Sequence, residues 1–375
     1  MFINERWNFF NMIGKISGSF FPIVFYAEVF SDLLQYKEII EHLGSEKKNT
    51  ICIICSDPSL AKWMKKNSLN HLYVPRFLIP AILSKIRCKV FVSSSPYLGE
   101  LQMGKLRRGC ISIYLFHSLN SIFKTYRKDA LKGFDIVLLP GEAHEKEFEL
   151  LYDSSERKKA VIAGYPLFDF WTKKFRELPL VKKNKILFAP TWGKKSLFTH
   201  ERDFIESLEA ILSIGYEIDV RPHPMTLIKG AERRSFKRIK NYFKGATNIQ
   251  WIEDLMNYDC IFNASLLVTD QSSISMEFTL ATLRPSIFLL GFEKVKNDAW
   301  ESLRYQPLEK DFQENIGFTL ALSNLHKEMG QILCINEGSE AKKRILDFKK
   351  RILSFEGEAT KRIASILEEQ ASRRE

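Results

Sequence analysis

Apolar residues along this chain come in short runs that alternate with stretches of helical periodicity. The runs PIVFYAE at residues 22–28, TICIICS at 50–56 and FDIVLL at 134–139 are typical of strands buried in a parallel sheet. Between the first two runs, the apolar residues from Ser31 to Leu43 recur at helix spacing. Strands that alternate with helices predict βαβ units, so we expect an α/β protein built on parallel sheets.

The alternation is interrupted between Trp171 and Lys185, where WTKKFRELPLVKKNK is polar and irregular. A length of 375 residues suits two domains better than one. We therefore predict two doubly wound, Rossmann-like domains, with the ligand in the cleft between them at the carboxyl ends of the strands. The predicted segments are an aromatic N-terminal segment at 1–21, a first domain at 22–172, a linker at 173–184, a second domain at 185–340, and C-terminal helices at 341–375 that could pack back on the first domain.

Small or polar residues follow directly after apolar strands at four places, namely FHS at 116–118, APTWG at 189–193, RPHP at 221–224 and TDQSS at 269–273. In the last of these, Ser272 and Ser273 stand where a helix would begin. Free backbone N–H groups, the helix dipole and two hydroxyls could then bind one phosphate. The alternative is an ordinary N-cap.

Two histidines are candidates for acid–base chemistry. His117 follows a strand of the first domain and could act as a general base, or it could cap the next helix. His223 lies between two prolines, with Arg221 one strand alternation away, so both side chains could face a diphosphate. The alternative for RPHP is a turn that only leaves the strand.

Two further positions suggest contacts with a nucleotide. Glu277, one turn into the helix after Ser273, could accept hydrogen bonds from a ribose diol or could only favour the helix dipole. The small residues of Ala189 to Gly193 would allow a ligand to approach the backbone closely.

Charge and composition limit the classes of partner, metal and cofactor that the chain is expected to bind. The net charge of +11 suits anionic lipids, phosphorylated substrates or nucleic acid, but the basic residues show little aromatic interleaving, which disfavours nucleic acid. The chain has no Asp-x-Asp pair, no phosphate loop and no metal-type cysteine grouping, so we expect no metal and no cofactor. Unpaired cysteines fit a reducing cytoplasm, and the aromatic residues before Pro22 could form an interfacial helix or pack on the protein.

Several stretches, in order and spacing, resemble the CDP-glycerol glycerophosphotransferase family of teichoic acid and capsule synthesis. These are FHSLNS, FDIVLLPGEAHEKEF, IAGYPLFDFW, ILFAPTWG, RPHP and VTDQSSISMEF, over roughly residues 110–290. The resemblance implies the two-Rossmann-domain fold called GT-B. It also implies a metal-independent transferase that moves glycerol phosphate or a similar polyol phosphate from a CDP-linked donor to a lipid-linked or glycan hydroxyl.

The resemblance assigns a role to each candidate residue. His117 would be the base in the acceptor domain, beside Ser118, where polymerases of the family commonly have glycine. His223 would lie beside the donor diphosphate, which the resemblance and the strand ends together assign to Arg221, Thr269, Asp270, Ser272 and Ser273. The nucleotide and its ribose would contact Gly164, Pro190, Thr191 and Glu277.

Two alternatives remain at this stage. One is a GT-B glycosyltransferase that uses a nucleotide sugar such as CMP-Kdo or a UDP-sugar, and the other is a non-catalytic nucleotide- or lipid-binding module. The expected location is the cytoplasmic face of the inner membrane, where the basic chain would meet an anionic surface.

Overall fold

The computed structural model describes residues 18–44, 51–127, 129–157, 159–177, 184–194, 196–228, 230–254, 257–270, 272–291 and 305–373. Most of the predicted aromatic segment at 1–21 lies outside these ranges. Contacts divide the chain into two compact units. The first comprises Met1–His117, Tyr126–Phe170 and Leu353–Glu375, and the second comprises Ser118–Thr125 and Trp171–Ile352.

The first unit contains a seven-stranded sheet in which all neighbouring strands are parallel, in the order β3-β2-β1-β4-β5-β6-β7. Its strands are β1 (Phe20–Ala27), β2 (Ile51–Cys55), β3 (His71–Tyr73), β4 (Arg87–Ser93), β5 (Ile111–Leu115), β6 (Ile136–Leu139) and β7 (Ala160–Ile162). The central strand β1 places Val24 opposite Cys52 on one side and Phe91 on the other. Every residue of β2 is buried, as a strand covered on both faces requires.

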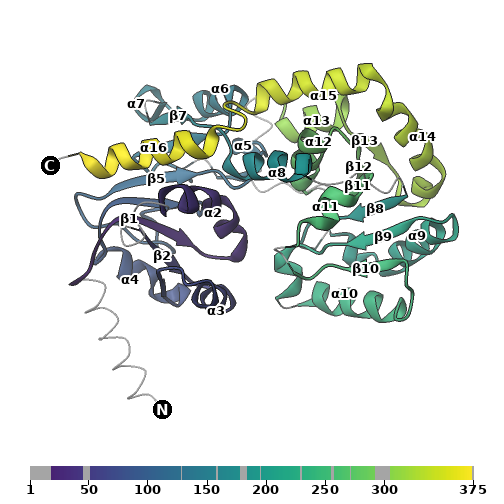
Figure 1. The fold of residues 1–375 in the computed structure, drawn as a ribbon, viewed down its shortest axis with the longest axis horizontal. Helices are drawn as coiled ribbons and strands as arrows, with labels where there is room; N and C mark the ends of the chain where they lie inside the picture. The colour runs from purple at the N-terminus through teal and green to yellow at the C-terminus, as the bar shows by residue number, and fades with distance from the viewer. Residues whose placement is uncertain are drawn as a thin grey trace, which may run out of the picture. The chain divides into compact units, whose positions relative to one another are not determined.

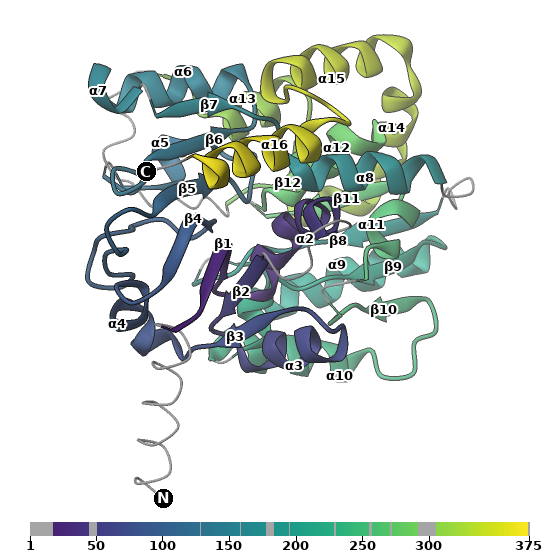
Figure 2. The same cartoon turned by 60° about the vertical axis from the view of Figure 1, so that its left-hand side comes forward.

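The helical segments of the first unit are α2 (Phe30–Gly44), α3 (Pro58–Lys66), η1 (Arg76–Leu78), α4 (Ile79–Leu83), α6 (Glu142–Leu151), α7 (Ser154–Arg157), α8 (Pro166–Glu177), which continues into the second unit, and α16 (Ala359–Ser372). Apolar residues of α2, α3 and α16 share one hydrophobic core with β1, β2, β4 and β5. Two views place α16 beside α2 on this face of the sheet (Figure 1 and Figure 2).

The last helix is held in the first unit by a carboxylate of α8. Asp169 accepts hydrogen bonds from the backbone N–H groups of Gly357 (2.7 Å) and Thr360 (2.9 Å), at the start of α16. An acidic side chain at that end satisfies open N–H groups and favours the helix dipole. Beside it, Ser354 donates its N–H to the carbonyl oxygen of Pro140 (2.9 Å). These bonds anchor the C-terminal segment to residues that are distant from it in the sequence.

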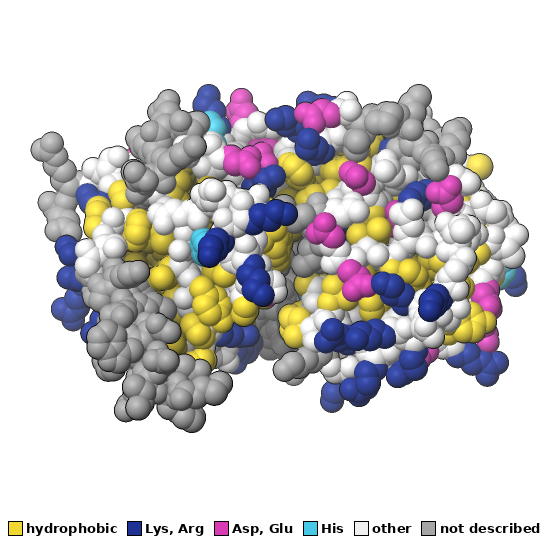
Figure 3. Space-filling model, turned by 60° about the horizontal axis from the view of Figure 1, so that its bottom comes forward, with side chains coloured by type: hydrophobic (Ala, Val, Ile, Leu, Met, Phe, Trp, Pro, Cys, Tyr) yellow, Lys and Arg dark blue, Asp and Glu magenta, His cyan; other side chains and the backbone are white. Residues whose placement is uncertain are grey.

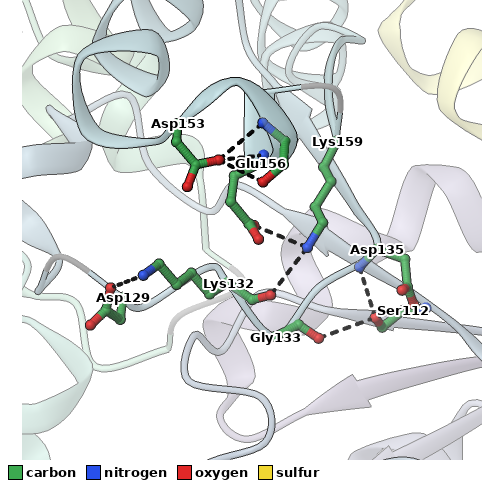
Figure 4. Close-up of polar contacts among 9 residues, drawn as sticks. Ser112, Asp129, Lys132, Gly133, Asp135, Asp153, Glu156 and Lys159 are labelled. Atoms are coloured by element: carbon green, nitrogen blue, oxygen red, sulfur yellow. Dashed lines mark hydrogen bonds and ion pairs between the residues drawn. The ribbon is translucent and has the colours of Figure 1, made fainter.

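Polar contacts join β5, β6 and α7 in the same unit (Figure 4). Asp135 accepts hydrogen bonds from the backbone N–H (2.8 Å) and the hydroxyl (2.7 Å) of Ser112. Lys159 pairs with Glu156 at 3.0 Å and lies 3.4 Å from the carbonyl oxygen of Lys132. These contacts set the beginnings of the strands, at the edge opposite the candidate site.

The second unit contains a six-stranded parallel sheet in the order β10-β9-β8-β11-β12-β13. Its strands are β8 (Lys185–Phe188), β9 (Glu217–Val220), β10 (Ile249–Trp251), β11 (Leu266–Thr269), β12 (Ser286–Leu289) and β13 (Phe318–Leu320). Its helical segments are α5 (Ile122–Thr125), η2 (Leu197–Thr199), α9 (Glu201–Ser213), η3 (Pro224–Leu227), α10 (Ala231–Tyr242), α11 (Asp259–Asn263), α12 (Ile274–Thr282), α13 (Leu308–Asn315), η5 (Leu322–Asn324), α14 (Leu325–Glu337) and α15 (Ser339–Ile352). Apolar residues of α9, α10 and α14 form one core with the sheet.

The α/β class with two parallel sheets is confirmed. Three details differ from the sequence-based expectation. Residues 173–177 of the predicted linker are helical and belong to α8. The C-terminal helices divide, since α15 lies in the second unit and α16 in the first. Residues 118–125, which were predicted in the first domain, belong to the second unit, where the Ser121 hydroxyl accepts the N–H of Leu308 at 2.7 Å.

Candidate functional site

His117 follows β5 at the carboxyl edge of the first sheet and is half-buried. Its Nδ1 atom lies 3.0 Å from the carbonyl oxygen of Ser94, the residue that follows β4. A carbonyl oxygen only accepts hydrogen bonds, so Nδ1 must carry the proton. In the neutral ring Nε2 then holds the lone pair, which is the arrangement that a general base needs.

Two adjacent residues of α2 support this geometry. The amide of Gln35 donates to the hydroxyl of Tyr165 (3.0 Å) and, at 3.4 Å, to the carbonyl oxygen of His117. The hydroxyl of Tyr36 accepts the N–H of Ser94 (2.6 Å) and donates to the carbonyl oxygen of Tyr26 (3.0 Å). Burial raises the pKa of Tyr36, so this hydroxyl keeps the proton that it donates. One helix therefore holds both the His117 backbone and the peptide that orients its ring.

Ser118 lies beside His117 but is turned inward. It is 7% exposed, and its hydroxyl accepts the N–H of Asn120 at 3.3 Å. This contact is a local turn of the serine type. Ser118 therefore shapes the chain after the histidine.

The RPHP turn is stiffened around His223. The Nδ1 atom of His223 accepts the backbone N–H of Met225 at 3.1 Å, which caps the short helix η3. The Nδ1 atom is thus the acceptor, and in the neutral ring Nε2 carries the proton. The ring lies 6.0 Å from that of Trp192, so the turn meets the APTWG loop that follows β8. His223 is oriented as a hydrogen-bond donor, opposite to His117.

Arg221 directly follows β9 and contacts the segment before α11. Its side chain is only 9% exposed, and Nη1 donates to the carbonyl oxygen of Asn257 at 2.9 Å. The guanidinium also lies 5.4 Å from the ring centroid of Tyr258. The alternation of β9 turns Arg221 toward the protein interior. Arg221 therefore braces the segment before α11, and its contact with a diphosphate stays a prediction.

Asp270 and Thr269 form a buried connection between β11 and the APTWG loop. The Asp270 carboxylate is fully buried and accepts the N–H groups of Thr191 (2.6 Å) and Leu197 (2.9 Å). The Thr269 hydroxyl donates to the carbonyl oxygen of Ala189 (2.8 Å) and accepts the N–H of Ser272 (3.1 Å). These bonds shape the loop and the helix start, and the contact of either side chain with a diphosphate stays a prediction.

Ser272 and Ser273 precede α12, and both are half-buried. Ser273 is the N-cap residue, yet its side chain makes no capping hydrogen bond. Neither serine hydroxyl bonds another residue of the described ranges, which disfavours the N-cap alternative. A helix N-terminus with two available hydroxyls suits an anion.

The four residues that were expected to contact the nucleotide lie in different parts of the structure. Glu277 is 7% exposed in the first turn of α12, and Pro190 and Thr191 are buried in the loop after β8. Gly164 lies in the first unit, where an added Cβ would be 2.6 Å from Cβ of Ala359 and 2.7 Å from the carbonyl oxygen of Ser354. The structure therefore gives Gly164 a packing role beneath α16, and its contact with a nucleotide stays a prediction.

Two further features are absent from the part of the chain that the structure describes. Within those ranges, no three His, Cys, Asp or Glu side chains are grouped as a metal site would need. Over the same part of the chain, no helix is long and apolar enough to cross a membrane.

Comparison with known proteins identifies the family. The model of the CDP-Glycerol:Poly(glycerophosphate) glycerophosphotransferase family matches residues 121–367, which is more than half of the chain. The chain belongs to this family. This glycerophosphotransferase family membership makes the protein a transferase, as the sequence motifs predicted. The comparison with curated proteins gave no match.

Solved structures support the fold of this glycerophosphotransferase family member. The wall teichoic acid polymerase TagF has a TM-score of 0.64 at 17% identity, over 93% of this chain and 88% of that chain. A histidine-to-asparagine variant of TagF, soaked with CDPG, has a TM-score of 0.61 at 16% identity, over the same shares of the two chains. The UDP-GlcNAc 2-epimerase from Methanocaldococcus jannaschii has a TM-score of 0.51 at 13% identity, over 94% of this chain and 100% of that chain.

The sequence-based search missed the residues that support the site. Gln35, Tyr36 and Ser94 were not singled out, because an ordinary amphipathic helix and a strand end carry no chemical motif. Glu232, whose carboxylate accepts the N–H of Gly193 at 2.7 Å, was also missed. Its place in the first turn of α10 was the one available signal.

Proposed function

We propose that this protein transfers glycerol phosphate, or a similar polyol phosphate, from a CDP-linked donor to a hydroxyl of a lipid-linked or glycan acceptor in bacterial surface polysaccharide assembly. Family membership supports the reaction class. The structural likeness to TagF, one structure of which was soaked with CDPG, supports the choice of donor. The acceptor is inferred from the reaction class.

The observation that carries the proposal is the opposite proton placement on two histidines. His117 donates from Nδ1, so Nε2 is the basic nitrogen of its neutral ring, whereas His223 accepts at Nδ1, so Nε2 carries the proton of its neutral ring. A transfer to a hydroxyl needs one group of each kind, a base for the nucleophile and a donor for the leaving group.

In the proposed step, the acceptor hydroxyl displaces CMP from the CDP-linked donor. His117 Nε2 takes the proton of the acceptor hydroxyl while that oxygen attacks the phosphorus of the glycerol phosphate group. The bond from this phosphorus to the bridging oxygen breaks, and CMP leaves with the electron pair. The Nε2 proton of His223, the hydroxyls of Ser272 and Ser273 and the N-terminus of α12 stabilise the charge that develops on CMP.

Three further properties belong to the same proposal. The transfer needs no bound metal, since the Nε2 proton of His223, the two serine hydroxyls and the N-terminus of α12 meet the diphosphate charge. The enzyme works at the cytoplasmic face of the membrane, where CDP-linked donors and lipid-linked acceptors meet. Its basic charge and the aromatic residues before Pro22 attach it to the anionic surface.

Donor choice is tested by thermal stabilisation, because a ligand bound only by the native state raises its melting temperature. CDP-glycerol, CDP-ribitol, CMP-Kdo and UDP-sugars are compared, and only a CDP-polyol should stabilise. Stabilisation by a sugar nucleotide alone would establish the glycosyltransferase alternative instead.

The catalytic assignment is tested with His117→Asn and a matched control, His71→Asn. His71 lies at the start of β3 in the same unit, and its Nδ1 also contacts a carbonyl oxygen, that of Leu69, at 2.8 Å. His117→Asn should lower turnover by at least about a hundredfold with unchanged donor affinity. Equal losses in the two variants would contradict the assignment of His117 as the base.

A further inference from the structure

A basic groove lies along α10 in the second unit, with a volume of about 500 Å³. Its charged rim consists of Arg233, Lys237, Lys240 and Lys244, and its apolar floor includes Phe243 and Trp251. Figure 3, which brings the lower side of Figure 1 forward, shows dark-blue Lys and Arg side chains gathered over the part of the molecule that carries α10.

The rim cations form a regular row. Arg233, Lys237 and Lys240 are spaced by four and three residues, so they lie on one face of α10, where such neighbours have Cβ atoms about 5–6 Å apart. Lys244 follows just beyond the C-terminal end of the helix. Successive charges of a linear polyanion could each meet one of these cations.

The row is poorly neutralised. Lys240 pairs with Glu253, and Arg233 donates to the carbonyl oxygen of Ile228 at 3.0 Å, which leaves its charge unbalanced. Lys237 and Lys244 are exposed and form no ion pair within the described ranges. The groove-lining residues therefore carry four positive charges against one negative charge, a net of +3.

The groove adjoins η3, the short helix that follows His223 along the chain. Leu227, the last residue of η3, lines the groove, and η3 follows His223 directly. The Phe243 and Trp251 rings, 6.4 Å apart, supply an apolar floor between the cations. Such a surface suits a chain in which phosphates alternate with short carbon segments.

We propose that this groove binds a linear phosphodiester polymer of polyol phosphate units, the acceptor or product chain of the transfer. The identity of the polymer rests on the proposed function, whereas the binding itself can be measured without turnover. A concave groove admits a single strand, which favours a polymer over a flat lipid surface. Chain binding here would keep a lengthening product near His223 between transfers.

The test compares two charge-reversal variants in the same unit. Lys237→Glu with Lys244→Glu changes the groove, and Lys342→Glu with Lys343→Glu changes exposed lysines of α15 by the same net charge. The probe is a glycerol phosphate oligomer of about ten units, titrated into the full chain at several salt concentrations. Thermal melting checks that both variants fold.

The groove variant should bind the oligomer at least about tenfold more weakly and lose about 1–2 from the slope of log affinity against log salt, while the α15 variant matches the parent. Equal weakening in both variants, or no binding by the parent protein, would overturn the proposal. Tighter, groove-dependent binding of anionic vesicles or of a single-stranded oligonucleotide would assign the groove to that partner instead. Oligomer binding that persists in a protein inactive with every CDP-polyol would refute the proposed function and leave the groove proposal standing.

Discussion

The Nδ1 atom of His117 lies 3.0 Å from the carbonyl oxygen of Ser94, and this one contact determines which ring nitrogen can act as a base. The carbonyl belongs to a peptide between β4 and the following loop, and the Tyr36 hydroxyl binds the N–H of the same residue. The proton placement on His117 therefore depends on a buried tyrosine of α2, which cannot reach a ligand itself.

Tyr36→Phe should lower turnover without changing donor binding. Without the hydroxyl, the Ser94 peptide is held less firmly and its carbonyl orients the His117 ring less well. We expect kcat to fall by about tenfold, with an unchanged donor Kd. The free energy of unfolding should fall by about 1–3 kcal/mol, because two buried groups lose their partner.

Tyr26→Phe is the control for this variant. Tyr26 is also buried, but its hydroxyl contacts Ser56 at 3.2 Å, and its carbonyl oxygen, which Tyr36 uses, is retained. If Tyr26→Phe lowers kcat as far as Tyr36→Phe does, the effect is a general loss of packing and the positioning role is wrong.

Asp270→Asn should weaken both folding and donor binding. The carboxamide can accept only one of the two N–H groups, from Thr191 and Leu197, and turns its own NH₂ toward the other. We expect the free energy of unfolding, measured by chemical denaturation, to fall by about 2–4 kcal/mol. Donor binding should also weaken, because the Thr191 loop carries Trp192 beside His223. The control is Asp203→Asn on the exposed face of α9, whose free energy of unfolding should stay within about 0.5 kcal/mol of that of the parent protein. Parent-like stability of Asp270→Asn would disprove the bracing role.

Gly164→Ala should displace the C-terminal helix. Gly164 has a φ of +88°, and its new Cβ would collide with Ala359 at the start of α16. We expect the free energy of unfolding to fall by about 2–4 kcal/mol and proteolysis between α15 and α16 to become faster. Gly99→Ala has a similar φ of +91° with nothing within 4 Å of the added Cβ, so it measures the backbone strain alone. Equal losses in the two variants would show that the collision is unimportant.

Asp32→Asn should flatten the dependence of stability on pH. Burial raises the pKa of Asp32 from 3.8 to about 7, against the opposing effect of the N–H groups of Val29 and Glu28. Because the folded pKa lies above the unfolded one, the contribution of Asp32 to stability is complete below about pH 3.8 and is lost as pH rises to about 7. The free energy of unfolding of the variant should therefore rise relative to that of the parent protein as the pH increases across this window. The difference should reach about 4 kcal/mol, at about 1.36 kcal/mol per pH unit. Unfolding curves that stay parallel from pH 4 to pH 8 would refute the shift.

The alternation of apolar runs and helical periods was enough to predict the two parallel sheets. Runs such as FDIVLL and LLVT are buried on both faces, and only a sheet covered by helices on both sides accommodates them. The strand ends were predicted for the same reason, since polar residues interrupt apolar runs where a strand meets solvent. His117, His223 and the Ser272–Ser273 helix start were found in this way.

The sequence by itself determined which residue types stand at the strand ends, and with them the family. The tertiary structure alone decided what each side chain does there. Asp270 meets Thr191 across 79 positions, His117 meets Ser94 across 23, and Asp169 meets Gly357 across 188. A hydrogen bond depends on distance and angle in space, and the local pattern of a chain specifies neither for residues so far apart.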